Sequence, residues 1–398
     1  MRAVIAFLLL PTILLATGCT DEGLTTSSIA TSESEASVEK AAARHYTFSR
    51  FLTGTSSCDN DSESASCLYK KNPKGTPGFS GPLFGLGAAP DGDILIADNG
   101  AGIAREDNGS GILEVHLPQA TDVSPIGRGA AWATTGPSAG NGTFDSGQGL
   151  HRTSLGNTRK IANLFAFESA NDPDGTGIHD SNPFDVQSLG GNAALVADAA
   201  ANALLRIDSR GNVKVLAVFP PALVSTSNLQ TLVGCPTPFI PDLAFICDVP
   251  MMPAQAVPTS VAIGPDGNYY VGELKGFPAP TGVSNIWRVS PNASSAACGA
   301  SPDCVEVFDG GFTSIIDLAF DEDGLLHVAE LDEASWFGME LGMGVGGTIN
   351  ACDLTTLSCS SVAAGIPILS SIAFGKNGSL WATRNALIPP IAEVVQIQ

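Results

Sequence analysis

Basic residues are scarce in this chain. Its 19 lysines and arginines face 40 aspartates and glutamates, which gives a net charge of −21. Nucleic acids and anionic lipid surfaces are recognised by clustered Lys and Arg, so neither is an expected partner, and we expect membrane contact only through a lipid anchor. Charged residues of both signs make up 15% of the chain, which favours an acidic globular protein over an acidic disordered one.

Motifs with a known chemistry are also missing from the sequence. It contains no Walker phosphate loop, no Cys-x-x-Cys, and no His-Glu-x-x-His among its five histidines. The stretch Gly136-Pro-Ser138-Ala-Gly140 matches Gly-x-Ser-x-Gly as a string. A nucleophile elbow requires a helix after the serine, however, and Gly-Asn-Gly-Thr follows here. We therefore interpret this stretch as a turn.

The apolar run near the start is too short to span a membrane. Ala3 to Ala16 gives roughly 14 residues, whereas a membrane-spanning helix needs about 20. With Arg2 before it and Ala16-Thr-Gly-Cys19 after it, the run resembles a bacterial lipoprotein signal over residues 1–18, in which Cys19 carries the lipid. Ordinary secretory cleavage nearby is the alternative. Residues 19–44 are rich in Ser, Thr and Glu and predict a disordered tether.

What the sequence does contain is an internal repeat. Five segments share a template in which a hydrophobic strand, an Asp-Gly-type turn, a second strand and a polar residue follow one another. The fifth position after the turn is small in every copy, as expected where neighbouring backbones approach closely. The segments are Gly85–Asp98, Asp185–Asp198, Ser260–Glu273, Asp317–Glu330 and Ser371–Arg384.

The spacing of the repeats predicts six units. Successive turns lie 100, 75, 57 and 54 residues apart, so the first interval holds two units and the second holds one unit with an insertion. Units of this size suit the four-stranded blades of a propeller. We therefore predict an all-β, six-bladed β-propeller over residues 45–398, with the unseen second unit near Ala130 to Ile161. Two β-sandwich domains are the alternative.

Eight cysteines besides Cys19 fall into four close couples. An extracytoplasmic location permits disulfides, and neighbour pairing is the simplest of the 105 possible schemes. Zinc is the competing interpretation, but the couples lie in separate units and lack the spacing of a zinc site. The predicted bridges are Cys58–Cys67, Cys235–Cys247, Cys298–Cys304 and Cys352–Cys359.

Polar residues recur at two template positions that should meet at one mouth of the propeller channel. Strands joined by a tight turn run antiparallel, so the start of each inner strand and the end of the next strand emerge on the same face. Acids gathered there bind a cation or pair with donors. The residues predicted to bind a ligand are Asp198, Asn202, Thr259, Glu273, Asp317, Glu330 and Arg384.

Ca²⁺ is the candidate ion for this mouth. Its candidate ligands are Glu273, Asp317, Asp198 and Asn182. The alternative for each acid is structural, because an Asp just past a strand often accepts N–H bonds from the loop that follows.

A second acidic cluster lies between residues 168 and 182. Glu168-Ser-Ala-Asn-Asp-Pro-Asp-Gly175 is followed by His179-Asp-Ser-Asn-Pro183 in a loop that enters the third unit. The cluster does not fit the EF-hand pattern, so it is weak as a lone calcium motif. It could also form a polar lid over the channel.

Five segments carry a family resemblance: Phe165–Gly175, Asp180–Pro183, Val196–Arg206, Val257–Pro278 and Gly311–Asp321. Together they are similar to the ScyD/ScyE family of secreted bacterial β-propellers, over a stretch from about Phe84 to the C-terminus. The resemblance implies the propeller fold and no particular reaction. The chain departs from the family pattern in the cysteine-bearing insertion from Pro220 to Pro253.

Wider propeller relatives imply two kinds of function. NHL-type propellers are mostly binding scaffolds, whereas gluconolactonase-like propellers hold a catalytic divalent cation with Glu, Asn and Asp on the channel axis. Fold analogy alone does not decide between them. We predict a monomeric, lipid-anchored, extracytoplasmic propeller whose polar face binds a small molecule or a protein. The alternative is a cation-dependent hydrolase of the lactonase type.

Overall fold

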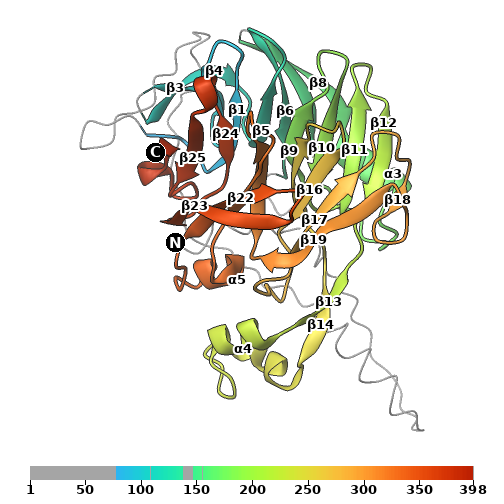
Figure 1. Ribbon diagram of the computed structural model, residues 1–398, viewed down its shortest axis with the longest axis vertical. Helices are drawn as coiled ribbons and strands as arrows, with labels where there is room; N and C mark the ends of the chain where they lie inside the picture. The colour runs from blue at the N-terminus through green and yellow to red at the C-terminus, as the bar shows by residue number, and fades with distance from the viewer. Residues whose placement is uncertain (1–77, 108, 138–146, 155, 398) are drawn as a thin grey trace, which may run out of the picture.

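Six antiparallel sheets stand side by side around a common axis (Figure 1). The structure is a computed structural model, which describes residues 78–107, 109–137, 147–154 and 156–397. The fold is a six-bladed β-propeller, as the repeat spacing predicts, and the alternative of two β-sandwiches is excluded.

The blades follow one another in chain order. Blade 1 contains β1 (Leu83–Ala88), β2 (Ile94–Asp98), β3 (Gly102–Asp107) and β4 (Ser110–His116). Blade 2 contains β5 (Ala120–Pro125), β6 (Ala130–Thr135), β7 (Gly149–Ser154) and β8 (Asn157–Asn163). Blade 3 contains β9 (Pro183–Ser188), β10 (Ala193–Asp198), β11 (Ala203–Asp208), β12 (Val213–Val218) and the short parallel β18 (Ala296–Ala297).

The second half of the ring is formed in the same way. Blade 4 contains β15 (Pro258–Ile263), β16 (Tyr269–Glu273), β17 (Ser284–Val289) and β19 (Cys304–Phe312). Blade 5 contains β20 (Ile315–Phe320), β21 (Leu326–Glu330), β22 (Gly347–Asp353) and β23 (Ser358–Ile366). Blade 6 contains β24 (Ile372–Phe374), β25 (Leu380–Arg384) and β26 (Glu393–Ile397). The helices are α3 (Leu164–Asn171), α4 (Ser227–Val233) and α5 (Ser335–Glu340), with short 3-10 turns η1 (Pro241–Asp248), η2 (Lys376–Gly378) and η3 (Pro389–Ile391).

The register of the inner strands follows the sequence template. In blade 4, Val261 pairs with Val271 and Ile263 pairs with Tyr269, so alternate side chains fill the space between blades. At the small template position, a Cβ on Gly272 would lie 2.6 Å from Cγ2 of Ile315 in blade 5. Neighbouring blades therefore approach closely there, as predicted.

Blade 2 is the unit whose turn signature is missing from the sequence. It begins at Ala120, ten residues before the predicted start at Ala130, and its second strand β6 coincides with the strand expected there. Its inner strand pairs Asp122 with Thr134, as Asp185 pairs with Ala197 in blade 3. Asp122 therefore occupies the first template position of blade 2.

The ring closes between blade 6 and blade 1. The Ser371 Oγ accepts a bond from Leu86 N at 2.9 Å, and the Ser370 Oγ donates to Leu83 O at 2.6 Å. The C-terminal strand β26 pairs with β25 within blade 6. The strand predicted over residues 45–51 lies outside the described residues, as do the signal, the tether, Cys19 and Ser138.

Three of the four predicted disulfides are confirmed. Cys235–Cys247, Cys298–Cys304 and Cys352–Cys359 are bonded, which excludes zinc at these couples, while Cys58 and Cys67 lie outside the described residues. The bridges indicate an extracytoplasmic location, because such bonds persist in oxidising compartments. Within the described part of the chain, the helices are too short or too polar to cross a membrane.

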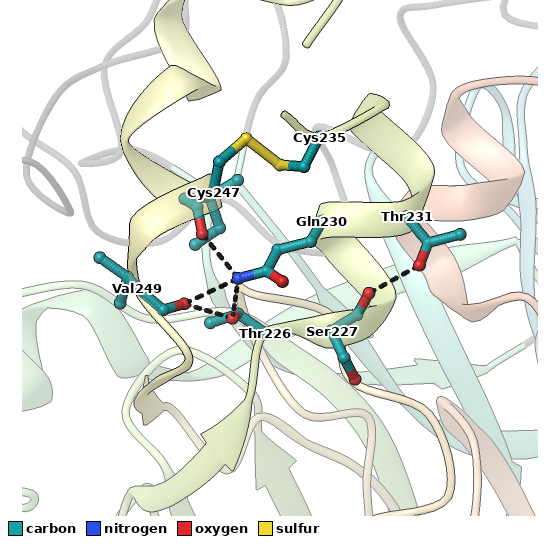
Figure 2. The surroundings of a disulfide bond; sticks show 8 residues. Thr226, Ser227, Gln230, Thr231, Cys235, Cys247 and Val249 are labelled. Carbon is teal, nitrogen blue, oxygen red and sulfur yellow. Dashed lines mark hydrogen bonds between the residues drawn. A yellow bond between two sulfur atoms is a disulfide. The ribbon is translucent and has the colours of Figure 1, made fainter. Parts of the chain in front are cut away.

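The insertion between blades 3 and 4 forms a separate cap, defined here as residues 220–255. Strands β13 (Ala222–Ser225) and β14 (Met251–Ala254) pair as a stalk that carries α4 and η1 below the propeller in Figure 1. Figure 2 shows how Cys235–Cys247 joins the two helical segments, while Gln230 Nε2 donates to Ile246 O at 2.9 Å. The two helical segments of the cap are therefore joined by one covalent bond and by the partly buried amide of Gln230.

Candidate functional site

The first template position lines the propeller axis. Its members in blade order are Gly85, Asp122, Asp185, Ser260, Asp317 and Ser371. All but Ser260 surround an axial cavity of about 10 Å³, together with Phe84, Phe184, Thr259 and Ile316. One water needs about 10–15 Å³, so this cavity has no space for a substrate.

The polar side chains at the axis bond one blade to the next. In each bond the donor is a main-chain N–H of the following blade, which leaves the carboxylate or hydroxyl occupied. The bonds are Val186 N to Asp122 Oδ2 at 2.9 Å, Val261 N to Asp185 Oδ2, Ile372 N to Asp317 Oδ2 at 2.8 Å and Leu86 N to Ser371 Oγ at 2.9 Å. These residues hold the ring together.

Burial raises the pKa values of the axial acids. It raises the pKa of Asp122 to about 6, although the hydrogen bond with Asp185 opposes this shift. It raises the pKa of Asp317 to about 8, and the charge of Asp185 adds to that shift. Burial, followed by the charge of Asp122, also raises the pKa of Asp185 well above its usual range, and the two carboxyls are hydrogen-bonded. We infer that this pair shares a proton at neutral pH, because two buried like charges in contact are unfavourable.

Asp198 and Glu330, at the ends of β10 and β21, accept hydrogen bonds that stabilise their own blades. Asp198 accepts bonds from Ser181 Oγ at 2.6 Å and from Asn182 N at 2.7 Å. Glu330 accepts bonds from Thr313 N and, at 2.7 Å, from Asn350 Nδ2, and burial raises its pKa to about 7. Both carboxylates therefore take the structural role that the sequence left as the alternative.

Glu273 forms an ion pair with a lysine of the same chain. Its Oε2 lies 2.6 Å from Lys275 Nζ, and its Oε1 accepts a bond from Trp287 Nε1 at 2.6 Å. All three side chains are buried. Burial raises the pKa of Glu273, and Lys275 opposes that shift. A buried ion pair of this kind occupies the carboxylate that the sequence assigned to a metal.

The four predicted calcium ligands do not fit one ion. Glu273 is paired with an ammonium group, and the oxygens of Asp198 accept N–H and O–H bonds. Asp317 bonds to the main chain of blade 6. Among the four, the structure joins Asn182 to Asp198, through the Asn182 N–H. A cation there would have to displace donors that already stabilise the fold.

The remaining predicted ligand residues also have structural partners. Thr259 Oγ1 donates to Ile315 O at 2.7 Å and so links blades 4 and 5. Arg384 is exposed and forms an ion pair with Glu393 in the neighbouring strand of its own sheet. Thr259 therefore lines the axial cavity with its hydroxyl hydrogen already donated to blade 5.

The cap shares an apolar cluster with residues of the propeller axis. One apolar cluster runs from the axial Phe84, Phe184 and Ile316 to Leu229 and Ile246 of the cap. The rings of Phe84 and Phe184 lie 5.8 Å apart. Asn228 Nδ2 further joins the cap to the propeller through Ala279 O at 2.8 Å. The insertion is therefore packed onto the propeller, an arrangement that the template could not predict.

A pocket of about 170 Å³ opens where the cap meets blade 3. Its walls are mostly apolar, and its polar groups come from the acidic loop and the stalk. Asn202 lies behind it, since its Nδ2 donates to Asp174 Oδ2 at 2.9 Å and to Gln255 Oε1 at 3.0 Å. The lining residues are Asp174, Thr176, Val218, Phe219, Pro220, Pro221, Gln255, Ala297 and Cys298.

The acidic loop beside the pocket gathers three carboxylates. One oxygen from each of Glu168, Asp172 and Asp174 lies within 4.8 Å of the others, and these residues could hold a metal ion. Glu168 is buried at the end of α3, while the two aspartates are partly exposed. The cluster found in the sequence is thus partly assembled in space.

The sequence patterns did not predict two residues of the interior, Asp122 and Lys275. Asp122 lies in Thr121-Asp122-Val123, which resembles Phe184-Asp185-Val186, but blade 2 lacks the Asp-Gly turn that would have aligned them. Lys275 follows Glu273 by two residues, past the end of the strand. A comparison of inner strands without the turn could have found Asp122.

No protein-family model and no curated protein matches the chain. Among solved structures, a gluconolactonase from Xanthomonas campestris is similar at 9% identity and a TM-score of 0.50, over 80% of this chain and 87% of that one. A virginiamycin B lyase from Staphylococcus aureus is 15% identical, with a TM-score of 0.44 over 80% and 85% of the two chains. A soluble aldose sugar dehydrogenase from Escherichia coli is 12% identical, with a TM-score of 0.45 over 80% and 96%. At these identities the likeness concerns the fold alone.

Proposed function

We propose that this chain is an extracytoplasmic, lipid-anchored binding propeller, which takes a small molecule in the pocket beside the cap. The observation that carries the proposal is the 170 Å³ pocket itself, since the axis has space for about one water. Cavities of about 150 Å³ accept a molecule of the size of benzene. Membership of the ScyD/ScyE family, which rests on the sequence resemblance, is part of the same proposal.

The walls of the pocket indicate the chemistry of its ligand. Phe219, Pro220 and Pro221 provide an apolar surface, and Asp174 and Gln255 provide polar groups at one side. A small amphipathic molecule with a hydrogen-bond donor fits this pattern, and a cationic donor fits it better than an anion.

The proposal is tested with three probes of one size. Benzylamine, phenol and benzoate are titrated into the full-length chain, and binding is followed by calorimetry and by the melting temperature. We expect saturable binding in the order benzylamine, phenol, benzoate. Ala297→Leu places a larger side chain on the pocket wall and should abolish binding. Ala300→Leu, at an exposed alanine outside the lining, is the matched control. Equal binding by both variants would refute the pocket.

The second candidate is a divalent-cation-dependent hydrolase of the lactonase type. Its support is the likeness of fold to the gluconolactonase from Xanthomonas campestris. For a substrate to reach Asp122, Asp185 and Asp317, the axial cavity of about 10 Å³ would have to widen. This second candidate is tested by lactone hydrolysis with added Ca²⁺, Mg²⁺ or Mn²⁺. Turnover that Asp317→Asn removes would favour the hydrolase over the binding module.

A further inference from the structure

The loop between α3 and blade 3 has the dimensions of a site for one ion. α3 presents Glu168 from its last turn, and the chain then reverses at Asp172, where φ is 43°. One carboxylate oxygen from each of Glu168, Asp172 and Asp174 lies within 4.8 Å of the others. Because Ca²⁺ binds oxygens at about 2.3–2.6 Å, two ligands of one ion lie at most about 5 Å apart.

Glu168 distinguishes this cluster from an ordinary acidic surface. Its side chain is 1% exposed. Among the described residues, neither of its carboxylate oxygens has a hydrogen-bond partner, and Asp172 Oδ1 has none either. A carboxylate in such a place is unfavourable unless it is protonated or bound to a cation.

The electrostatic surroundings of Glu168 also favour a cation. The charges of Asp198, Asp174, Asp180 and Asp172 all act on the Glu168 carboxyl. A divalent ion would compensate several of these charges at once. The other oxygen of Asp172 accepts a bond from Gly177 N at 3.0 Å, which holds the loop in position without occupying Oδ1.

We propose that Glu168, Asp172 and Asp174 bind one Ca²⁺ ion, at a site separate from the propeller axis. The donors are carboxylate oxygens on a helix end and a loop, which matches the flexible oxygen coordination of Ca²⁺. Asp172 and Asp174 are partly exposed, so water can complete the coordination. Mg²⁺ demands a nearly ideal octahedron at about 2.0–2.1 Å and rarely uses such an all-carboxylate set.

The ion would connect the acidic loop to the foot of the cap. Asp174 Oδ2 accepts a bond from Asn202 Nδ2 at 2.9 Å, and Asn202 also bonds to Gln255 at 3.0 Å and to Val257 N at 3.1 Å. Asp174 and Gln255 both line the pocket. Ca²⁺ would therefore fix one wall of the pocket, although the cation site does not depend on the proposed ligand.

The test is a titration of the full-length chain after removal of divalent ions with a chelator. CaCl₂ and MgCl₂ are added separately, and binding is followed by calorimetry and by the melting temperature. We expect one Ca²⁺ per chain with a dissociation constant of about 10⁻⁴–10⁻³ M or lower, a rise in melting temperature with Ca²⁺, and weaker binding of Mg²⁺. Glu168→Gln should raise the dissociation constant for Ca²⁺ at least tenfold.

Two further variants keep the test decisive. Asp174→Asn changes a partly exposed ligand, so it reports on the site even if Glu168→Gln misfolds, and it should also weaken binding at least tenfold. Glu340→Gln is the matched control, because Glu340 on α5 is another carboxyl whose pKa burial raises, to about 8. The proposal is overturned by a wild-type chain that binds no Ca²⁺ at about 10 mM, or by equal effects of Glu168→Gln and Glu340→Gln. Loss of binding in Asp317→Asn with Glu168→Gln unaffected would also overturn it, because the ion would then lie at the axis.

Discussion

At the scale of single residues, the side chain at the first template position of one blade limits which residue fits at that position in the neighbouring blade. Four blades place Asp or Ser there to bond the next blade, whereas blade 1 has Gly85. A Cβ on Gly85 would lie 1.9 Å from Asp122 Oδ1 and 2.7 Å from Asp122 Cα. The side chain of Asp122 fills that space, so only glycine fits opposite it.

We therefore expect Gly85→Ala to destabilise the propeller by about 1–3 kcal/mol, the usual cost of overpacking. The measurement is the midpoint of urea unfolding. Gly191→Ala is the control, because its nearest contacts would be 3.7 Å away. Equal midpoints for Gly85→Ala and the wild-type chain would contradict the steric explanation.

At the scale of elements, the cap shows what an insertion changes. The template predicted where the polar residues emerge, and the strands confirm those positions. It could not predict that α4 and η1 would pack onto the propeller, because Leu229 and Ile246 join an apolar cluster with residues distant in sequence, such as Phe84. Partners such as Lys275 beside Glu273 likewise depend on loop geometry that a strand pattern does not contain. The fold was thus predictable and the site was not.

The cap should open locally when its disulfide is removed. In Cys235→Ser/Cys247→Ser, we expect cleavage within residues 222–254 by a protease under native conditions, while the far-UV spectrum of the propeller is kept. A disulfide that closes a loop of about 15 residues stabilises the folded state by about 3 kcal/mol. Its removal should therefore allow the cap to unfold locally. Cys352→Ser/Cys359→Ser, in the hairpin of β22 and β23, is the control. Equal resistance of the cap in both variants would argue against this role.

At the scale of the whole molecule, buried carboxyls connect stability to pH. Burial raises the pKa of Asp317 and Glu340 to about 8, of Glu330 to about 7 and of Asp122 to about 6. The folded chain therefore holds protons that the unfolded chain releases above about pH 4. The contribution of these four protonated carboxyls to the free energy of unfolding is complete below about pH 4. It is lost as the pH rises through their pKa values in the folded chain.

We accordingly expect a lower melting temperature at pH 8 than at pH 5.5, measured with a chelator present. Each such group changes the free energy of unfolding by at most about 1.4 kcal/mol per pH unit. Asp317→Asn keeps the shape and removes one titrating proton, so it should reduce the difference between the two temperatures. Asp208→Asn, at an exposed turn, should not. A melting temperature that increases from pH 5.5 to pH 8 would be inconsistent with protonated axial acids.

The paired strands of the stalk allow the cap to be exchanged as one segment. Ala222 pairs with Ala254 at its foot, so the two ends of the inserted segment leave the ring as neighbours. A segment with adjoining ends can be gained, shortened or exchanged without altering the order of the blades. Replacing residues 222–254 by a short turn should therefore leave the six blades folded in the same order.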